Sequence, residues 1–184
     1  MVYWALLPAR RSGVRTLAAS LAASAQTLAA TLAVAQEVNA SGKEFLTAFC
    51  GGVEVECKIA ESMNPQHYKQ GFHTTSTVGV FAAVTAAAKL YRLTDEQTRF
   101  AIGIAASKSA GLRVNFGTMT KPYHAGAAAE NGIIAARLAK LGYQSDPNAL
   151  DGQWGHFQVT AGGVDSDRLL GHLGNPYTLA WPGV

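Results

Sequence analysis

The chain contains little cysteine, little proline and few charged residues. Its 184 residues include two cysteines and six prolines, and charged residues make up 15%. The low proline content excludes a proline-rich scaffold. The apolar fraction of 48% and the net charge of +3 are typical of a folded chain rather than a disordered one. The length therefore indicates one domain, large enough to bury a core.

The sequence also lacks a cluster of basic residues. Fifteen Lys and Arg stand against twelve Asp and Glu, and the densest basic group is Arg10 and Arg11 with Arg15 nearby. Nucleic-acid binding domains usually carry a basic stripe, so we expect no nucleic-acid partner. Polar residues interrupt every apolar segment, so we also expect no membrane span.

The two cysteines, Cys50 and Cys57, are seven positions apart. On one helix they would lie about 10 Å apart along the axis, whereas a disulfide needs Cα atoms closer than about 7 Å. We therefore expect two free thiols, which suits a reducing compartment. The motifs CxxC and HExxH are absent, so the sequence does not support a structural zinc site.

The beginning of the chain allows two interpretations. No acidic residue precedes Glu37, and residues 16–35 are rich in Ala, Ser, Thr and Leu. Leucines at positions 17, 21, 28 and 32 share one helical face, which predicts a helix between the surface and the core. An acid-poor start that contains arginine is also typical of a transit peptide or export signal. We favour the helix.

Capping signals divide the rest of the chain into helices. Ser41 with Glu44 and Thr94 with Gln97 form capping boxes, and Gly142 is a natural helix stop. No strand pattern of any length appears, although the tail from Tyr177 could form a strand. The sequence predicts an all-α bundle, with close helix contacts at the Gly- and Ala-rich second helix. The expected helices span about 42–62, 75–91, 95–107, 122–141 and 166–172, with a helical turn at 146–151.

Two polar segments interrupt this pattern at helix starts. Residues 71–77 (GFHTTST) place His73 and four hydroxyl groups there, and residues 115–124 (NFGTMTKPYH) place Lys121 and His124 at another. Free N–H groups make a helix start suitable for an anion. A lysine there has the wrong sign for the helix dipole, so a functional role is more plausible for it than a structural one. The residues alone leave two alternatives, a carboxylate or phosphate site and ordinary capping beside a solvated lysine.

These segments carry a resemblance to a known family. Residues 71–77, 93–97 (LTDEQ) and 115–126 (NFGTMTKPYHAG) resemble the MmgE/PrpD family, and the similarity runs over 27–184. That family includes 2-methylcitrate dehydratase, cis-aconitate decarboxylase and iminodisuccinate epimerase. The resemblance implies a large helical domain, a smaller lid domain and an active site between them that uses no metal and no cofactor.

The resemblance also assigns residues. It makes His73 and Lys121 the catalytic pair, with His73 as general acid or base and Lys121 as a clamp on a substrate carboxylate. It implies proton transfer next to a carboxylate, as in a lyase acting on a citrate-like di- or tricarboxylate. The alternatives are a carboxylate-binding or interaction module, an epimerase of an amino or imino diacid, and an inert remnant. The expected substrate-binding residues are Thr74, Thr75, Ser76, Thr77 and His124.

The departures from the family lead to further expectations. Members are more than twice as long, so we interpret 1–26 as an atypical extension and 27–184 as part of the helical domain, without the lid. The isolated chain is then expected to be inactive and to associate, either as a homodimer or with a complementary chain that supplies the lid. We expect a cytoplasmic protein, or one of the mitochondrial matrix if the start is a transit peptide.

The remaining histidines and tryptophans receive structural interpretations. We expect His67 to fix the loop before residue 71 and His156 to pack at a turn. His172 is expected at the exposed end of a helix, whereas Trp154 and Trp181 are expected to anchor the core.

Overall fold

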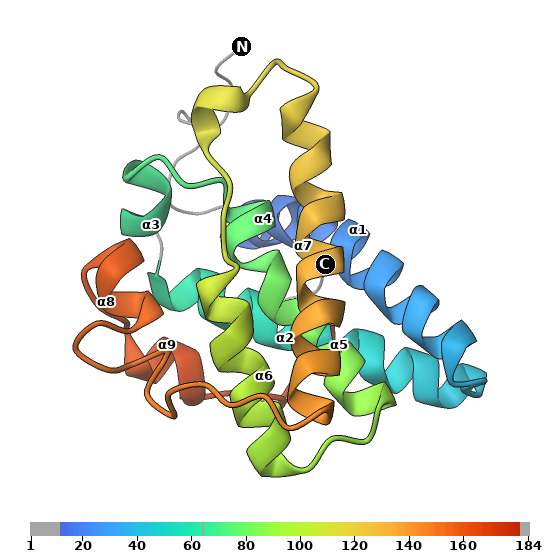
Figure 1. Ribbon diagram of the computed structural model, residues 1–184. Coiled ribbons are helices and arrows are strands. Elements are labelled where there is room, and N and C mark those ends of the chain that lie inside the picture. The colour runs from blue at the N-terminus through green and yellow to red at the C-terminus, as the bar shows by residue number, and fades with distance from the viewer. Residues whose placement is uncertain (1–11, 64, 181–184) are drawn as a thin grey trace.

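The computed structural model describes residues 12–63 and 65–180, and their side chains from residue 24 onward. In this part of the chain the protein is all-α, as predicted, and its one β-type pairing is an isolated bridge between Phe72 and Leu112. Figure 1 shows the arrangement of the helices. They are α1 Ser12–Glu37, α2 Gly42–Met63, α3 Gln66–Lys69, α4 Thr74–Thr77, α5 Gly79–Leu90, α6 Asp95–Ser107, the 3-10 turn η1 Arg113–Asn115, α7 Thr120–Lys140, α8 His156–Ala161 and α9 Ser166–Leu170.

Helix α5 forms the centre of the bundle. It packs against α1, α2, α6 and α7, and ten of its twelve residues are buried. Two glycines on neighbouring helices allow close approach: a Cβ on Gly132 would lie 2.4 Å from Ala83 Cβ, and one on Gly52 would lie 2.7 Å from the Ala82 carbonyl oxygen. The predicted close contacts of small residues are therefore confirmed.

The predicted helix ends are confirmed where local chemistry defines them. The Glu44 N–H donates to Ser41 Oγ, the Ser41 N–H donates to Glu44 Oε2, and Thr94 and Gln97 form the second capping box. Gly142 follows α7 with φ +92°, and the Tyr143 N–H donates to the Leu138 carbonyl. These reciprocal bonds satisfy backbone groups that a helix end would otherwise leave unpaired.

Three predictions about secondary structure need correction. The helix expected over 75–91 is two helices, because the chain bends at Val78 between α4 and α5. The turn at 146–151 is not helical. The tail from Tyr177 is not a strand, since Thr178 lies in a turn and Leu179 and Ala180 have π-helical geometry, and the Ala180 N–H donates to the Tyr177 carbonyl.

Helix α1 confirms the helical interpretation of the N-terminal region, but its leucine face points outward. Leu28 and Leu32 are each 47% exposed, whereas the buried face carries Gln26, Thr27 and Thr31 with small apolar residues. The side chains of the other two leucines lie outside the described residues. Gln26 can be buried because it has a polar partner in the interior: its Nε2 donates to Glu56 on α2 over 2.7 Å.

Trp154 is 83% exposed, so its predicted role as a core anchor is wrong. It lies in the turn before α8, where the neighbours Gly155 and His156 are buried instead. Trp181 lies outside the described residues. His172 is exposed just after α9, as predicted, and no disulfide joins Cys50 and Cys57.

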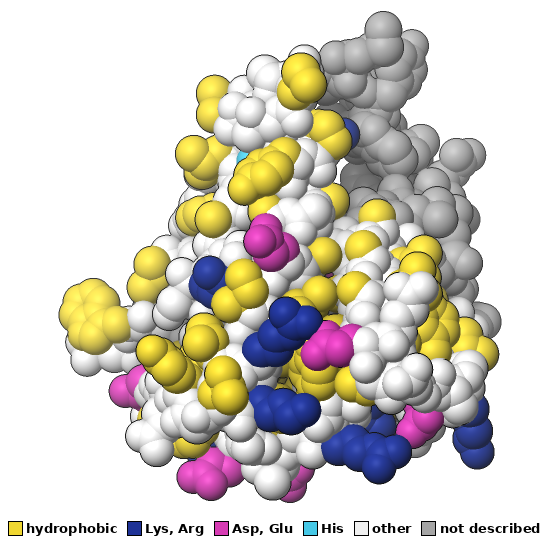
Figure 2. Space-filling view, turned by 45° about the vertical axis from the view of Figure 1, so that its right-hand side comes forward, with side chains coloured by type: hydrophobic (Ala, Val, Ile, Leu, Met, Phe, Trp, Pro, Cys, Tyr) yellow, Lys and Arg dark blue, Asp and Glu magenta, His cyan; other side chains and the backbone are white. Residues whose placement is uncertain are grey.

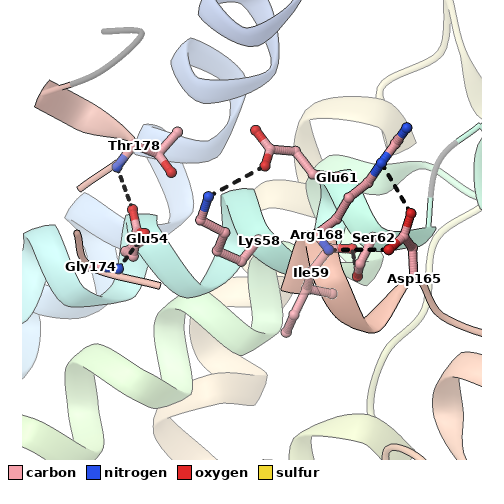
Figure 3. A network of polar contacts seen from close by, with 9 residues as sticks. All are labelled: Glu54, Lys58, Ile59, Glu61, Ser62, Asp165, Arg168, Gly174 and Thr178. Atoms are coloured by element: carbon pink, nitrogen blue, oxygen red, sulfur yellow. Dashed lines mark hydrogen bonds and ion pairs between the residues drawn. The ribbon is translucent and has the colours of Figure 1, made fainter. Parts of the chain in front are cut away.

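The segment after α9 is attached to α2 by a buried carboxylate. Glu54 is 3% exposed and accepts the backbone N–H groups of Gly174 (2.9 Å) and Thr178 (2.6 Å) (Figure 3). Asp165 begins α9 as its N-cap, and its own N–H donates to the Ser62 carbonyl. Among the described residues no helix is long and apolar enough to cross a membrane.

Candidate functional site

The two polar segments singled out in the sequence meet in space. The His73 N–H donates to the Gly111 carbonyl over 3.0 Å, and the Arg113 N–H donates to the Gly71 carbonyl over 2.8 Å. These two bonds flank the bridge between Phe72 and Leu112. The loop before α4 is thereby fixed against the loop that leads into α7, which places His73 beside the start of α7.

The centre of the site is a pair of histidines. His73 precedes α4, His124 lies in the first turns of α7, and their Nδ1 atoms are 2.9 Å apart. Both side chains are buried, with 7% and 6% exposure. The rings of His73 and Phe116 pack edge to face, with their centres 4.8 Å apart. One Nδ1 must therefore donate to the other, because two lone pairs at this distance would repel.

The surroundings of His73 favour the neutral imidazole. Burial, then the nearby His124 and Lys121, lower the pKa of His73 to about 4. A neutral imidazole at neutral pH can accept a proton from a carbon acid or donate one from its single N–H. The site thus holds a neutral imidazole, His73, hydrogen-bonded to a second imidazole and close to a cation.

Lys121 is the second residue of α7, and its side chain is exposed. Its Nζ lies 5.5 Å from the centre of the Phe116 ring, the same ring that contacts His73. The Thr120 N–H donates to Thr118 Oγ1 at this helix start. Lys121 therefore sits at the mouth of the site, where an anion could reach it together with the positive end of α7.

The four hydroxyl residues of 74–77 divide into two pairs. Ser76 and Thr77 are buried and engaged within the protein, since Ser76 Oγ donates to the His124 carbonyl and Thr77 Oγ1 lies 2.7 Å from His67 Nε2. Thr74 and Thr75 are half-buried. The structure thus leaves Thr74 and Thr75 as the more accessible hydroxyls of the predicted substrate-binding set.

Two further histidines, His67 and His156, are buried near the loop that precedes α4. His67 is fully buried, its ring stacks on Phe72 at 4.7 Å, and its Nδ1 lies 3.1 Å from the Thr160 carbonyl. Since a carbonyl only accepts, Nδ1 carries the proton, and the Thr77 hydroxyl donates to Nε2. Burial lowers the pKa of His67, and also lowers the pKa of His156 to about 4. The structural interpretations of both are confirmed.

The sequence did not reveal that His73 and His124 form a hydrogen-bonded pair. The two lie 51 positions apart, so no local pattern could show it, although both stand in the polar segments. The buried Glu56 was also missed, because a Glu on a helix is usually exposed. Burial raises the pKa of Glu56 well above its ordinary value, against hydrogen bonds from Gln26 and Thr27.

The site is separate from the main cavity of the described residues. That cavity, of about 860 Å³, lies at the other end of α5, between the start of α2 and the start of α6, and its lining includes Tyr91 and Lys140. Within 12–63 and 65–180, no group of three or more His, Cys, Asp or Glu side chains is placed to hold a metal ion. The histidine pair is therefore a candidate acid–base site near the start of α5, apart from that cavity.

Comparison with known proteins identifies the family of the chain. Residues 16–169 match the MmgE/PrpD N-terminal domain. The chain is 38% identical over 112 residues to human cis-aconitate decarboxylase, covering 60% of this chain and 23% of that protein, and 34% identical over 136 residues to the mouse protein, covering 72% and 28%. It is 32% identical over 119 residues to a cis-aconitate decarboxylase-like protein of Aspergillus oryzae, covering 64% and 25%. It spans about a quarter of the length of these relatives. With its family match and its all-α fold, the chain belongs to the MmgE/PrpD family.

Proposed function

We propose that this chain supplies part of the active site of an MmgE/PrpD lyase. The substrate would be a citrate-like di- or tricarboxylate, such as 2-methylcitrate or cis-aconitate, and the reaction would move a proton next to a carboxylate. The observation that carries the proposal is the buried pair His73 and His124, joined at 2.9 Å beside Lys121. Relatives named cis-aconitate decarboxylase support the lyase class.

Each residue would have a defined task. Lys121 would hold a substrate carboxylate at the mouth of the site, because a hydrogen bond between two charged groups is among the stronger kinds. The start of α7 adds a partial positive charge. Thr74 and Thr75 would hold a second carboxylate, which is supported by their half-buried position at the start of α4.

The histidine pair would carry the proton transfer. In dehydration, a base takes the proton from the carbon beside a carboxylate while an acid protonates the departing hydroxyl group. In decarboxylation, the electrons of the broken carbon–carbon bond form an enolate-like anion that takes up a proton. Both reactions develop negative charge, which Lys121 would stabilise electrostatically. These residues therefore serve either outcome, and an epimerase would use the same intermediate.

Exposed apolar side chains around the site favour association with another chain. Val114 is 83% exposed, Met119 91% and Tyr123 65%, and all three lie in or next to the segment that carries Lys121. Exposed apolar groups of this kind mark interaction surfaces. We propose that a second copy or a complementary chain covers this rim, and that a carboxylate-binding module without independent activity is the alternative for the chain alone.

A thermal melt tests the proposal. The purified chain is heated with and without 2-methylcitrate, cis-aconitate, citrate or an iminodisuccinate analogue. A ligand that binds the folded form raises Tm by mass action, so we expect a rise with one of the tricarboxylates. The same melt with Lys121→Ala is the control and should lose the rise. A cooperative melt that no compound shifts would contradict carboxylate binding by this chain.

A further inference from the structure

We infer that His124 is a positioning residue that fixes the tautomer of His73, so that the pair presents one unprotonated and one protonated Nε2. The inference deepens the proposed function, and its chemical consequence rests on that proposal. Its structural content concerns only the two rings, the Nδ1 atoms of which are 2.9 Å apart.

The atoms that face each other determine the tautomers. A neutral imidazole carries one proton on one of its two nitrogens. If one ring donates through Nδ1, its Nε2 has a lone pair. The ring that accepts at Nδ1 must then carry its proton on Nε2. A neutral pair joined Nδ1 to Nδ1 therefore has one basic and one acidic outer nitrogen.

Burial and nearby charge favour the neutral form of His73. Both side chains are less than a tenth exposed, and the ion pairs of the described residues include neither histidine. A buried imidazolium without a carboxylate partner is costly. The Lys121 ammonium adds repulsion and contributes to lowering the pKa of His73 to about 4. The neutral form of His73 follows from these surroundings.

Two neighbours hold the His124 ring in place. Ser76, which is 3% exposed, donates from Oγ to the His124 carbonyl over 3.1 Å. Gly111 accepts the His73 N–H at its carbonyl, and a Cβ at this glycine would lie 2.8 Å from Ser76 Cβ and 3.6 Å from His124 Cγ. With φ +144°, Gly111 has a backbone conformation that suits glycine. One residue thus fixes the backbone of His73 and leaves room for His124.

The pair can then complete a reaction without gaining or losing a proton. In dehydration, the unprotonated Nε2 takes the proton from the substrate carbon, and the carbon–hydrogen electrons form the enolate-like anion. The Nδ1 proton of that ring passes to Nδ1 of the other ring, and the other Nε2 gives its proton to the departing hydroxyl group, which leaves as water. In decarboxylation, the carbon–carbon bond breaks, CO₂ leaves, and the carbanion takes the proton of the protonated Nε2. The Nδ1 proton of the other ring then passes to this ring, and solvent returns one proton to the opposite Nε2.

Nuclear magnetic resonance of the whole chain, with ¹⁵N-labelled histidine and no ligand, tests the inference. At neutral pH we expect one protonated and one unprotonated Nδ1, assigned to His73 and His124 and linked by a scalar coupling across the hydrogen bond. His124→Ala should abolish the coupling and leave His73 as a mixture of tautomers. His124→Gln serves as a second variant, and far-UV circular dichroism checks that each variant is folded. His172→Ala, at an exposed histidine, should leave the coupling unchanged.

The outcomes separate the inference from the proposed function. A folded wild-type chain in which both Nδ1 atoms are tautomer mixtures, or in which no coupling joins them, overturns the inference whatever the melts show. Loss of the coupling in His172→Ala would overturn the assignment to His124. A coupling that is present while no tricarboxylate shifts Tm supports the inference about the rings and contradicts the proposed function instead.

Discussion

The polar side chains at the two ends of helix α5 differ in burial: those at its start are buried, and those at its end are exposed. At its start, near His73, four imidazoles are buried, and three of them, His67, His73 and His124, are hydrogen-bonded to backbone, hydroxyl or one another. At its end, around the cavity, lysines, arginines and acids are exposed and form ion pairs such as Arg92 with Glu44. Figure 2 shows Lys and Arg gathered over the lower half of one face, with histidine almost hidden.

The contrast shows which end can perform proton chemistry. Water screens the exposed charges and stabilises them whatever their partners. Buried imidazoles depend on each hydrogen bond, and their protonation follows their surroundings. The proton chemistry that we propose is therefore assigned to the histidine end of α5, whereas the charged groups around the cavity are exposed.

Lowering the pH should cause the largest loss in the free energy of unfolding, and this loss should arise first from the histidines at the start of α5. The pKa values of His67, His73 and His156 are lowered from 6.5 in the folded chain. Their contribution to the free energy of unfolding is therefore present above pH 6.5 and lost as the pH falls through 6.5 toward 4. Urea unfolding at a series of pH values measures this loss.

The acid titration has two internal controls. The pKa of Glu44 at the other end is lowered to about 2 by Ser41 and Arg92, so its contribution is lost only below pH 4.5. Burial raises the pKa of Glu56, so that its contribution has the opposite sign and fades as the pH rises. Repeating the series in Glu56→Gln removes this opposing effect. Stability that stayed constant from pH 6.5 to 4 in that variant would contradict the role of the histidines.

His67→Ala should be the most damaging substitution. It removes a fully buried ring, leaves the Thr160 carbonyl without its partner and the Thr77 hydroxyl with only the His73 carbonyl, and removes the stacking on Phe72. We expect the free energy of unfolding to fall by roughly 3 kcal/mol. Lys89→Ala at the other end, where the side chain is exposed, should change it by less than about 0.5 kcal/mol. Equal effects at both ends would remove the contrast between them.

Gly111→Ala should be damaging because of contact as well as conformation. Both Gly111 (φ +144°) and Gly142 (φ +92°) have positive φ, but only a Cβ at Gly111 meets other atoms, at 2.8 Å from Ser76. We expect Gly142→Ala to cost about 1 kcal/mol and Gly111→Ala about 2 kcal/mol or more in chemical denaturation. If the two variants were equally stable, the packing of Gly111 against Ser76 and His124 would not matter.

Lys121→Ala should weaken binding of a tricarboxylate about tenfold, because one charge-assisted hydrogen bond contributes roughly 1.5 kcal/mol or more. Lys140→Ala removes an equally exposed lysine at the cavity end of the bundle and should leave the affinity unchanged. Calorimetric titration measures both. Unchanged affinity in Lys121→Ala would exclude the carboxylate clamp, and a loss in Lys140→Ala would move the binding site to the other end.

The smallest effect is expected from Arg92→Ala. The Arg92 and Glu44 side chains are 82% and 47% exposed, and their ion pair is 3.0 Å long. Exposed ion pairs of this kind contribute little, and salt screens what remains. We expect no measurable change in the urea midpoint at physiological salt. A clear loss would show that charge at this end stabilises the fold more than its exposure suggests.

Local chemistry allowed much of the fold to be predicted. The capping boxes at Ser41 and Thr94 and the stop at Gly142 depend on residues within a few positions of one another, and each defines a helix end in the structure. Trp154 was misplaced for the opposite reason. Its burial depends on whether another part of the chain covers it, which hydrophobicity alone does not reveal.

The sequence indicated which segments form the candidate site, but it did not show which of their residues contact one another. The polar helix starts pointed to His73, Lys121 and His124, whereas their arrangement depends on the backbone bonds that join Gly111 to His73. The hydroxyls of Ser76 and Thr77 look like ligand-binding groups in the sequence. Their use inside the protein becomes apparent only when His124 and His67 are seen beside them.

The close packing at Gly132 makes this residue the point about which a tilt of α7 would displace the start of the helix. The helix is clamped there against Ala83 and Val84 of α5, and Lys121 stands about 16 Å away along the axis. Tilting α7 by about 4° at this pivot would displace its first turn by about 1 Å, a misplacement large enough to slow catalysis about a hundredfold. A bulkier residue at Gly132 would therefore disturb the chemistry from the middle of the bundle, without touching a single atom of the site.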